Sequence, residues 1–246
     1  MTDLSPIPFV KARHSKAVPE RKIRLLVVHT CEILEKGDTA ELIAAFFSKG
    51  SKQVSAHYCV DADSVVQCVK DHDVAYAAPG GNHDGLQFEL AGFAAQNSLQ
   101  WADAYSNKML DRLAVLLRAK AAEHNIPLVY LNDAGVRAGK SGITTHAVIS
   151  RVYKKSNHTD PGPWFPMGEL IRRCVENVTI EAPKPVPKPQ GDDMTAEEHD
   201  WLGRVHHELV NPESSLQRRL AALEAAALAS AKVVAAAKPT AAVKKA

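Results

Sequence analysis

The sequence predicts an α/β domain in which a mixed β-sheet is flanked by helices, followed by a short α-helical C-terminal tail. Two observations carry the prediction for the domain: β-branched apolar runs alternate with amphipathic stretches at helical spacing, and two of the apolar runs have the pattern of a hairpin. Of the 246 residues, 46% are hydrophobic and 24% are charged, as is ordinary for a globular protein. Residues 1–180 are enough to bury one core.

The expected elements follow one another along this domain. KIRLLVVHT at 22–30 is a β-branched apolar run, typical of a buried central strand. Asp38, three residues before Glu41, is expected to cap a helix through LIAAFF. AHYCVDADSVVQCV at 56–69 predicts two strands joined at DADS. Further strands are expected at 86–92 and 126–131, and further helices at 106–125 and 167–178.

The composition changes near residue 180. EAPKPVPKPQGDD at 181–193 alternates prolines with lysines and predicts an extended linker. Residues 194–246 are rich in alanine and are expected to be helical. Leu216, Leu220 and Leu223 form a short seam at four- and three-residue spacing. Such a seam favours self-association of this tail.

The net charge and the length of the apolar runs indicate which classes of partner are not expected. A net charge of only +2 gives no indication of a nucleic-acid partner. No apolar run is long enough to span a bilayer, so membrane insertion is not expected. The first residues lack the apolar run of a secretory signal, and we therefore expect a protein made in the cytoplasm.

The cysteines do not indicate a metal or redox site. Cys31, Cys59, Cys68 and Cys174 are scattered without CxxC spacing. We expect them to be small, buried, free thiols. A Cys59–Cys68 disulfide across the hairpin is the less favoured alternative.

Three residues that can coordinate a metal come from separate segments. His29 ends the first predicted strand, where α/β folds present site residues. His146 follows DAGVRAGKSG at 133–142, a Gly-rich stretch expected to be a loop. Asp160 lies in SNHTDPGPWFP at 156–166, whose prolines and glycine stiffen the backbone. Two imidazoles and a carboxylate leave a fourth position open, as in catalytic zinc sites. A lone His at a strand end is more often a hydrogen-bonded structural residue, and the wide sequence separation cannot establish a site by itself.

Several blocks in order resemble one family. LVVHT, VSAHYCVDADSVVQCV, LQFELAG and THAVISRVYKKSNHTDPGPWFP are similar to the zinc-dependent type 2 N-acetylmuramoyl-L-alanine amidases. Peptidoglycan recognition proteins and many phage endolysins share this fold. The resemblance covers residues 20–177, and HTDPGPWFP is its most specific block. It implies Zn²⁺ bound by His29, His146 and Asp160, with Glu89 as general base and His158 steadying the oxyanion.

The resemblance also implies a substrate and a setting. The bond cleaved would join N-acetylmuramic acid to L-alanine in peptidoglycan, and the protein looks most like an endolysin of an actinobacteriophage. Such an enzyme is made in the host cytoplasm and reaches the cell wall after release by a holin. A peptidoglycan-binding protein without activity and a cytosolic amidase that recycles muropeptides are the alternatives. Non-catalytic relatives typically lack the ligand at the position of Asp160, so its presence favours an enzyme.

Three other residues carry expectations of their own. Ala77 stands where the family often has a His that contacts the substrate. His57 is expected to be structural or to support a ligand instead of binding metal. Trp164 is expected to pack the DPGPWFP loop against the last helix.

Overall fold

A computed structural model describes residues 6–176 and 180 of the chain. The predicted linker at 181–193 and the helical tail at 194–246 lie outside the described residues. The boundary near residue 180 and self-association through the tail therefore stay predictions.

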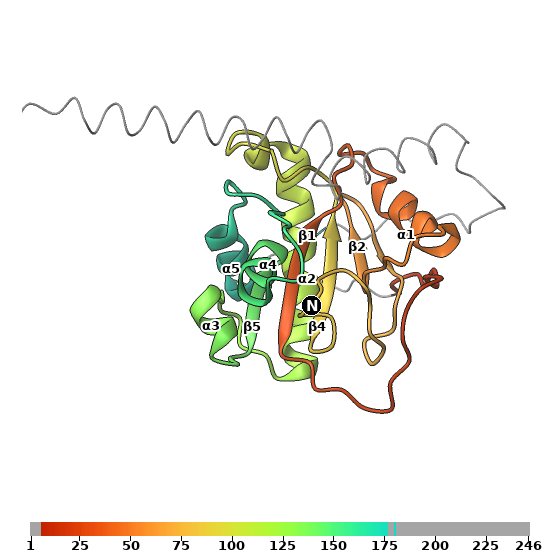
Figure 1. Cartoon of the computed structure of the whole chain (residues 1–246). Helices are drawn as coiled ribbons and strands as arrows, with labels where there is room; N and C mark the ends of the chain where they lie inside the picture. The colour runs from red at the N-terminus through yellow and green to blue at the C-terminus, as the bar shows by residue number, and fades with distance from the viewer. Residues whose placement is uncertain (1–5, 177–179, 181–246) are drawn as a thin grey trace, which may run out of the picture. The chain divides into compact units, whose positions relative to one another are not determined.

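Five strands form one mixed sheet in the order β3–β2–β4–β1–β5 (Figure 1). The central strand β1 (Leu25–Thr30) is parallel to both of its neighbours, β4 (Gly85–Leu90) and β5 (Gly142–Thr145). On the other side of β4, β2 (Tyr58–Val60) is parallel to it and pairs antiparallel with β3 (Val65–Gln67). The carboxyl ends of β4, β1 and β5 therefore meet at one edge of the sheet.

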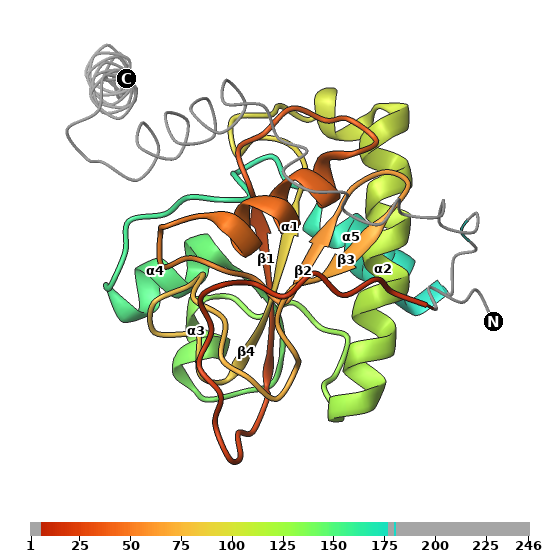
Figure 2. The same ribbon diagram turned by 90° about the vertical axis from the view of Figure 1, so that its right-hand side faces the viewer.

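Helices cover both faces of this sheet. Leu26 and Val28 of β1 face a large core built with α2 (Ala104–His124) and α5 (Met167–Glu176). Leu25 and Val27 alternate with them and face a smaller core built with α3 (Asp133–Arg137) and α4 (His146–Tyr153). Figure 2 shows the sheet between its two layers of helices, with α2 and α5 on one face. The opposite face carries α1 (Thr39–Lys49), α3 and α4. A mixed sheet flanked by helices is the predicted fold class, which is confirmed.

Most predicted elements are present with shifted ends. The run at 22–30 contains β1, the hairpin at 56–69 contains β2 and β3, and the run at 86–92 overlaps β4. The helices expected after Asp38, at 106–125 and at 167–178 correspond to α1, α2 and α5. A short 3₁₀ turn, η1 (Gln100–Ala102), precedes α2 and is not predicted. Among the described residues, none of the helices combines the length and apolar character needed to cross a membrane.

The strand expected at 126–131 is wrong. This segment forms only an isolated bridge, in which Tyr130 lies opposite Ile143 of β5. Two backbone hydrogen bonds make the bridge, from Leu131 N–H to the Ile143 oxygen and from Ile143 N–H to the Val129 oxygen. Pro127 lacks a backbone donor, and Val129 donates back to its carbonyl, which turns the chain away from an extended ladder. The strand that follows in the sequence, β5, is an element of only four residues and is not among the predicted strands.

The loop expected at 133–142 is also partly wrong, because it begins with the helical turn α3. Asn132 caps this turn, since its side chain accepts a hydrogen bond from the backbone N–H of Gly135 at 3.0 Å. Only Gly139, with φ of 71°, uses the conformational freedom of glycine in this stretch.

The start of α1 is capped by a different side chain from the predicted one, Asp38. Asp38 occupies the N-cap position, but its side chain makes no capping hydrogen bond. Asp61 from the DADS turn accepts from the backbone N–H of Ala40 at 2.9 Å instead. Its other oxygen accepts from the backbone N–H groups of Asp63 and Ser64, so one buried carboxylate holds both the hairpin turn and the start of α1.

The cysteines are free thiols, as expected, and three of the four are buried. Cys59 and Cys68 lie across the β2–β3 hairpin with their sulfur atoms 3.7 Å apart, too far for a covalent bond.

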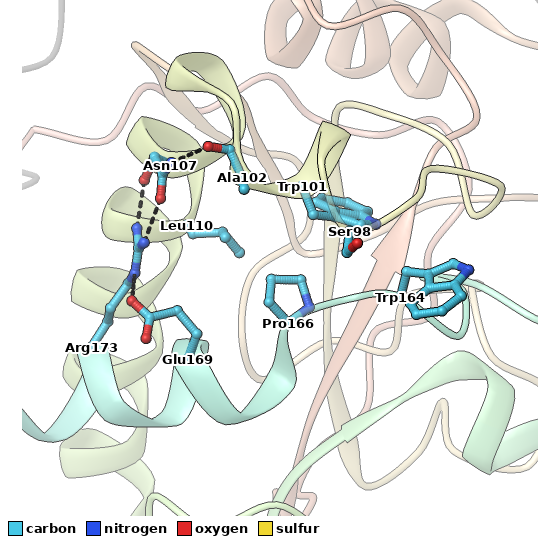
Figure 3. Close-up of a pocket in the computed structure, with 9 residues that line it drawn as sticks. All are labelled: Ser98, Trp101, Ala102, Asn107, Leu110, Trp164, Pro166, Glu169 and Arg173. Carbon is cyan, nitrogen blue, oxygen red and sulfur yellow. Dashed lines mark hydrogen bonds and ion pairs between the residues drawn. The ribbon is translucent and has the colours of Figure 1, made fainter.

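The expectation for Trp164 is wrong. Its side chain is 59% exposed, whereas the next residue, Phe165, is buried in the main core. The Phe165 ring meets Trp101 edge-on, with centroids 5.0 Å apart, and shares its core with Leu170 of α5. The loop is thus anchored on α5 by Phe165, and the indole of Trp164 lines a surface cavity (Figure 3).

This difference predicts unequal effects of two neighbouring substitutions. Phe165→Ala should lower the free energy of unfolding by about 3–5 kcal/mol, because it empties a ring-sized space in the core. Trp164→Ala should cost below about 1 kcal/mol, since most of the side chain already contacts water. Urea denaturation of both variants measures the difference. Equal losses would contradict the anchoring role of Phe165.

Candidate metal centre

Three side chains lie in register at the carboxyl edge of the parallel strands. His29 of β1 pairs with Glu89 of β4. On the other side, Val28 of β1 pairs with Thr145, so His146 follows β5 next to His29. Thr145 also caps α4 by accepting from the backbone N–H of Val148 at 3.3 Å. Strand pairing and this cap place His146 at the first turn of a helix, with its ring directed to His29.

Asp160 reaches the same point from the DPGPWFP loop. Its backbone carbonyl accepts from the N–H of Ala147 at 2.9 Å, which ties the loop to the start of α4. The Asp160–Pro161 peptide bond is cis, and Gly162 follows with φ of 92°. A Cβ atom at Gly162 would lie 1.9 Å from the backbone oxygen of Ala94, so only glycine fits here.

The donor atoms of these residues have the separations that one metal ion requires. His29 Nδ1 and His146 Nδ1 are 3.1 Å apart. Each lies 3.2 Å from a different oxygen of Asp160. Ligands bound to one tetrahedral zinc at about 2.0–2.1 Å are about 3.3 Å apart. All three residues are buried, and Asp160 Oδ2 accepts no hydrogen bond from any described residue. The donor set fits zinc.

The electrostatics of the cluster also suit a cation. Burial desolvates His29, but the charges of Glu89 and Asp160 outweigh it and raise the pKa of His29 to about 9. Burial lowers the pKa of His146 to about 4, although Asp160 opposes this. Burial would raise the pKa of Asp160, but contacts with His146, His158 and His29 hold that pKa well below its usual range. The carboxylates around the cluster thus favour a positive charge, which a bound metal ion would supply in place of a proton on His29.

Glu89 and His158 lie beside the three donors. Glu89 Oε1 is 3.9 Å from His29 Nδ1, and its Oε2 is buried without a hydrogen-bond donor among the described residues. Burial raises the pKa of Glu89, while the charge on His29 opposes the rise. His158 stacks on His146, with ring centroids 4.1 Å apart, and its Nδ1 lies 3.2 Å from Asp160 Oδ1. The structure therefore brings all five predicted site residues together.

A comparison with protein families shows which family the chain belongs to. The model described as N-acetylmuramoyl-L-alanine amidase matches residues 19–163, more than half of the chain, and the match includes all five residues. The chain belongs to the type 2 N-acetylmuramoyl-L-alanine amidases. It is therefore a peptidoglycan amidase by family, with a buried His-His-Asp group of the kind that binds zinc in these enzymes.

Solved structures of similar fold include several amidases and endolysins. A selenomethionine derivative of AmpD is 21% identical, with a TM-score of 0.50 over 73% of this chain and 99% of that chain. A mutant endolysin from Bacillus subtilis is 17% identical, with a TM-score of 0.48 over 71% and 99%. The hydrolase AmiA from Staphylococcus aureus is 13% identical, with a TM-score of 0.49 over 68% and 83%. The likeness to AmpD shows the shared amidase fold. None of the curated proteins is similar enough to match.

Glu32 lies close enough to the amidase site to feel the charges of Asp160 and Glu89, and it is not among the predicted site residues. It has a φ of 56° and its Oε1 accepts from Thr30 Oγ1 at 2.7 Å and from the backbone N–H of Ala94 at 2.8 Å. Burial raises the pKa of Glu32 to about 7, although these hydrogen bonds oppose the rise. Since Ala94 also contacts Gly162, Glu32 links the end of β1 to the loop that carries Asp160. An acidic residue in the first turn after a strand-end His was the available signal.

His57 supports the amidase site without touching its donors, in agreement with its expected structural role. Its ring is fully buried, and its Nδ1 accepts from the backbone N–H of Gln87 at 3.0 Å. Its Nε2 lies 3.1 Å from Arg21 Nη2 and also 3.1 Å from the backbone oxygen of Asp73. Burial lowers the pKa of His57 to about 3, so the ring is neutral.

The cavity beside Trp164 does not share these residues. It has a volume of about 300 Å³ and lies among η1, α2 and α5 (Figure 3). The charged and polar side chains at its rim bond to one another, because Arg173 donates to Asn107, Asp111 and Glu169. None of the predicted metal or catalytic residues lines it.

Proposed function

We propose that this amidase is a zinc enzyme that cleaves the bond between N-acetylmuramic acid and L-alanine, and that it serves a phage as an endolysin. The observation that carries the catalytic part is the convergence of His29, His146 and Asp160, with Glu89 directly beside His29. Bound zinc would supply Lewis acidity, polarising the scissile carbonyl and lowering the pKa of water to about 7.

Glu89 is proposed as the general base. Its Oε2 is buried and has no donor among the described residues, so it can take a proton from an attacking water. The water oxygen bonds to the lactyl carbonyl carbon, and the carbon–nitrogen bond then breaks. Glu89 returns the proton to the departing nitrogen, which leaves as the amino terminus of L-alanine. Burial supports this role because it raises the pKa of Glu89 and brings it closer to neutral pH.

His158 is proposed to stabilise the oxyanion. Asp160 is ionised and can only accept, so His158 Nδ1 must donate to it. The second ring nitrogen, Nε2, can then donate only when the ring is an imidazolium. His158 is partly exposed beside the site, and in its imidazolium form it would offer both a hydrogen bond and a charge to the developing oxyanion.

The biological setting is the second part of the proposal. We propose that the protein is made in the host cytoplasm, that a holin releases it to the wall, and that the host is an actinobacterium. Support comes from the resemblance of HTDPGPWFP and its companion blocks to phage endolysins. Peptidoglycan is the only substrate class that the family implies.

A lysis assay tests this setting. Full-length protein expressed in a bacterium should lyse the cells only when a holin is produced as well, and the Glu89→Gln variant should not lyse them. Purified actinobacterial sacculi should be cleared by the wild type, a chelator should stop the clearing, and added Zn²⁺ should restore it. Activity on soluble muropeptides without any on sacculi would instead support a recycling amidase.

A further inference from the structure

Gln87 is buried next to the metal centre and has no role in the chemistry described above. It lies on β4, two residues before Glu89, and is fully buried. Its Oε1 lies 2.9 Å from His29 Nε2, the ring nitrogen on the far side from the donor cluster. Gln87 thus contacts one metal ligand directly but offers no atom to the metal.

The orientation of the Gln87 amide is fixed by two backbone carbonyls. Its Nε2 donates to the oxygens of Gly81 at 3.1 Å and Gly85 at 3.3 Å. Carbonyl oxygens only accept, so the NH₂ end must face them and Oε1 must face His29. A Cβ atom at Gly85 would lie 2.9 Å from Gln87 Nε2 and 2.5 Å from the Gly81 oxygen, so a glycine makes room for this arrangement.

The backbone of Gln87 is held as firmly as its side chain. Its N–H donates to His57 Nδ1, so the hydrogen of the neutral His57 ring is on Nε2, which donates in turn to the backbone oxygen of Asp73. The amide therefore cannot turn over or withdraw without breaking several buried hydrogen bonds.

This fixed amide determines which nitrogen of His29 is free. Because Gln87 Oε1 only accepts, His29 Nε2 must carry hydrogen. In the neutral ring, the lone pair is then on Nδ1, which is the atom that faces His146 Nδ1 and Asp160 Oδ2. We infer that Gln87 is a positioning residue that holds His29 in the ring orientation and tautomer that bind zinc. The inference rests on the proposed zinc site.

Within the described part of the chain, the other imidazole has no comparable partner. His146 Nε2 lies 3.5 Å from Ser156 Oγ, at the limit of a hydrogen bond. Ser156 is itself 2.6 Å from Ser150 Oγ, and a hydroxyl can donate or accept. Ser156 therefore does not select a tautomer, which makes it a matched control for Gln87.

The test is zinc affinity of the full chain, measured by competition with a chromophoric chelator. Gln87→Met keeps the length of the side chain but removes the acceptor, and zinc should bind about 10–100-fold more weakly. Gln87→Glu keeps an acceptor for His29, and its second oxygen, which replaces the NH₂ group, donates to one of the two carbonyls when it is protonated. Its affinity should recover toward that of the wild type. Ser156→Ala should bind more tightly than Gln87→Met.

A stability control separates positioning from packing. Asn82 accepts from the backbone N–H groups of Ala77 and Ala78 in the loop before β4, and none of its hydrogen bonds with described residues involves His29. Asn82→Ala should lower the Tm of the zinc-free protein and leave zinc affinity unchanged. Should Gln87→Met not fold, Gln87→Asn replaces it, since its shorter amide cannot span both contacts, and the same loss is expected.

The outcomes are distinguishable. Wild-type affinity in Gln87→Met, or an equal loss in Gln87→Glu, would overturn the inference while leaving the zinc enzyme intact. A wild-type protein that binds no zinc would overturn the proposed function and this inference together.

Discussion

Glu89→Gln should keep its zinc and lose about 10²–10⁴-fold in kcat, the usual cost of removing a general base. The substitution preserves shape and removes the proton acceptor, while the three metal donors keep their places around His29. The measurement is turnover of a soluble muropeptide alongside the zinc content of the same sample.

A matched carboxylate outside the site serves as control. Glu169 on α5 binds Arg172 and Arg173 and lines the cavity beside Trp164, so Glu169→Gln should retain wild-type turnover. Glu89→Gln with near-normal kcat would assign the base to another group and contradict the role proposed for Glu89.

Removal of any metal donor should abolish zinc binding. His29→Ala, His146→Ala and Asp160→Ala each leave two donors of a buried set of three, and a site with two protein ligands holds zinc poorly. Elemental analysis should fall from about one zinc per chain to nearly none in each variant, with hydrolysis lost in parallel.

His83→Ala is the control for this series, because His83 is an exposed histidine in the loop before β4. It should retain full zinc and full activity. Full zinc occupancy in any of the three donor variants would remove that residue from the ligand set.

The parts of the fold that could be predicted are those with strong local signals. The β-branched apolar run before His29 is typical of a buried central strand, and it forms β1. The DADS turn between two apolar runs predicts the hairpin of β2 and β3. The rigid DPGPWFP loop indicated that Asp160 is held in place. These signals are local, and they survive in the structure.

The parts that could not be predicted depend on contacts between distant segments. β5 has only four residues, and its place beside β1 is decided by pairing and not by its own pattern. Asp61 caps α1 in place of Asp38 because a turn 21 residues away brings a buried carboxylate to Ala40. The burial of Phe165 in place of Trp164 depends in the same way on Trp101, which the fold places beside it.

The candidate site shows the same division. Residue types and family blocks were sufficient to name His29, His146 and Asp160, but not to reveal that strand register aligns His29 with both Glu89 and His146. The function of Gln87 depends on the carbonyls of Gly81 and Gly85, which no spacing in the sequence discloses.

Mass analysis of the products from purified peptidoglycan tests the central claim most directly. Digestion with the zinc-loaded wild type should release stem peptides with a free amino group on L-alanine, and glycan strands whose lactyl groups end in newly formed carboxylates. The zinc-free protein and Glu89→Gln should release almost none. New reducing sugar ends without free L-alanine termini would show that the enzyme cuts the glycan, and would contradict an amidase acting at the His29–His146–Asp160 centre.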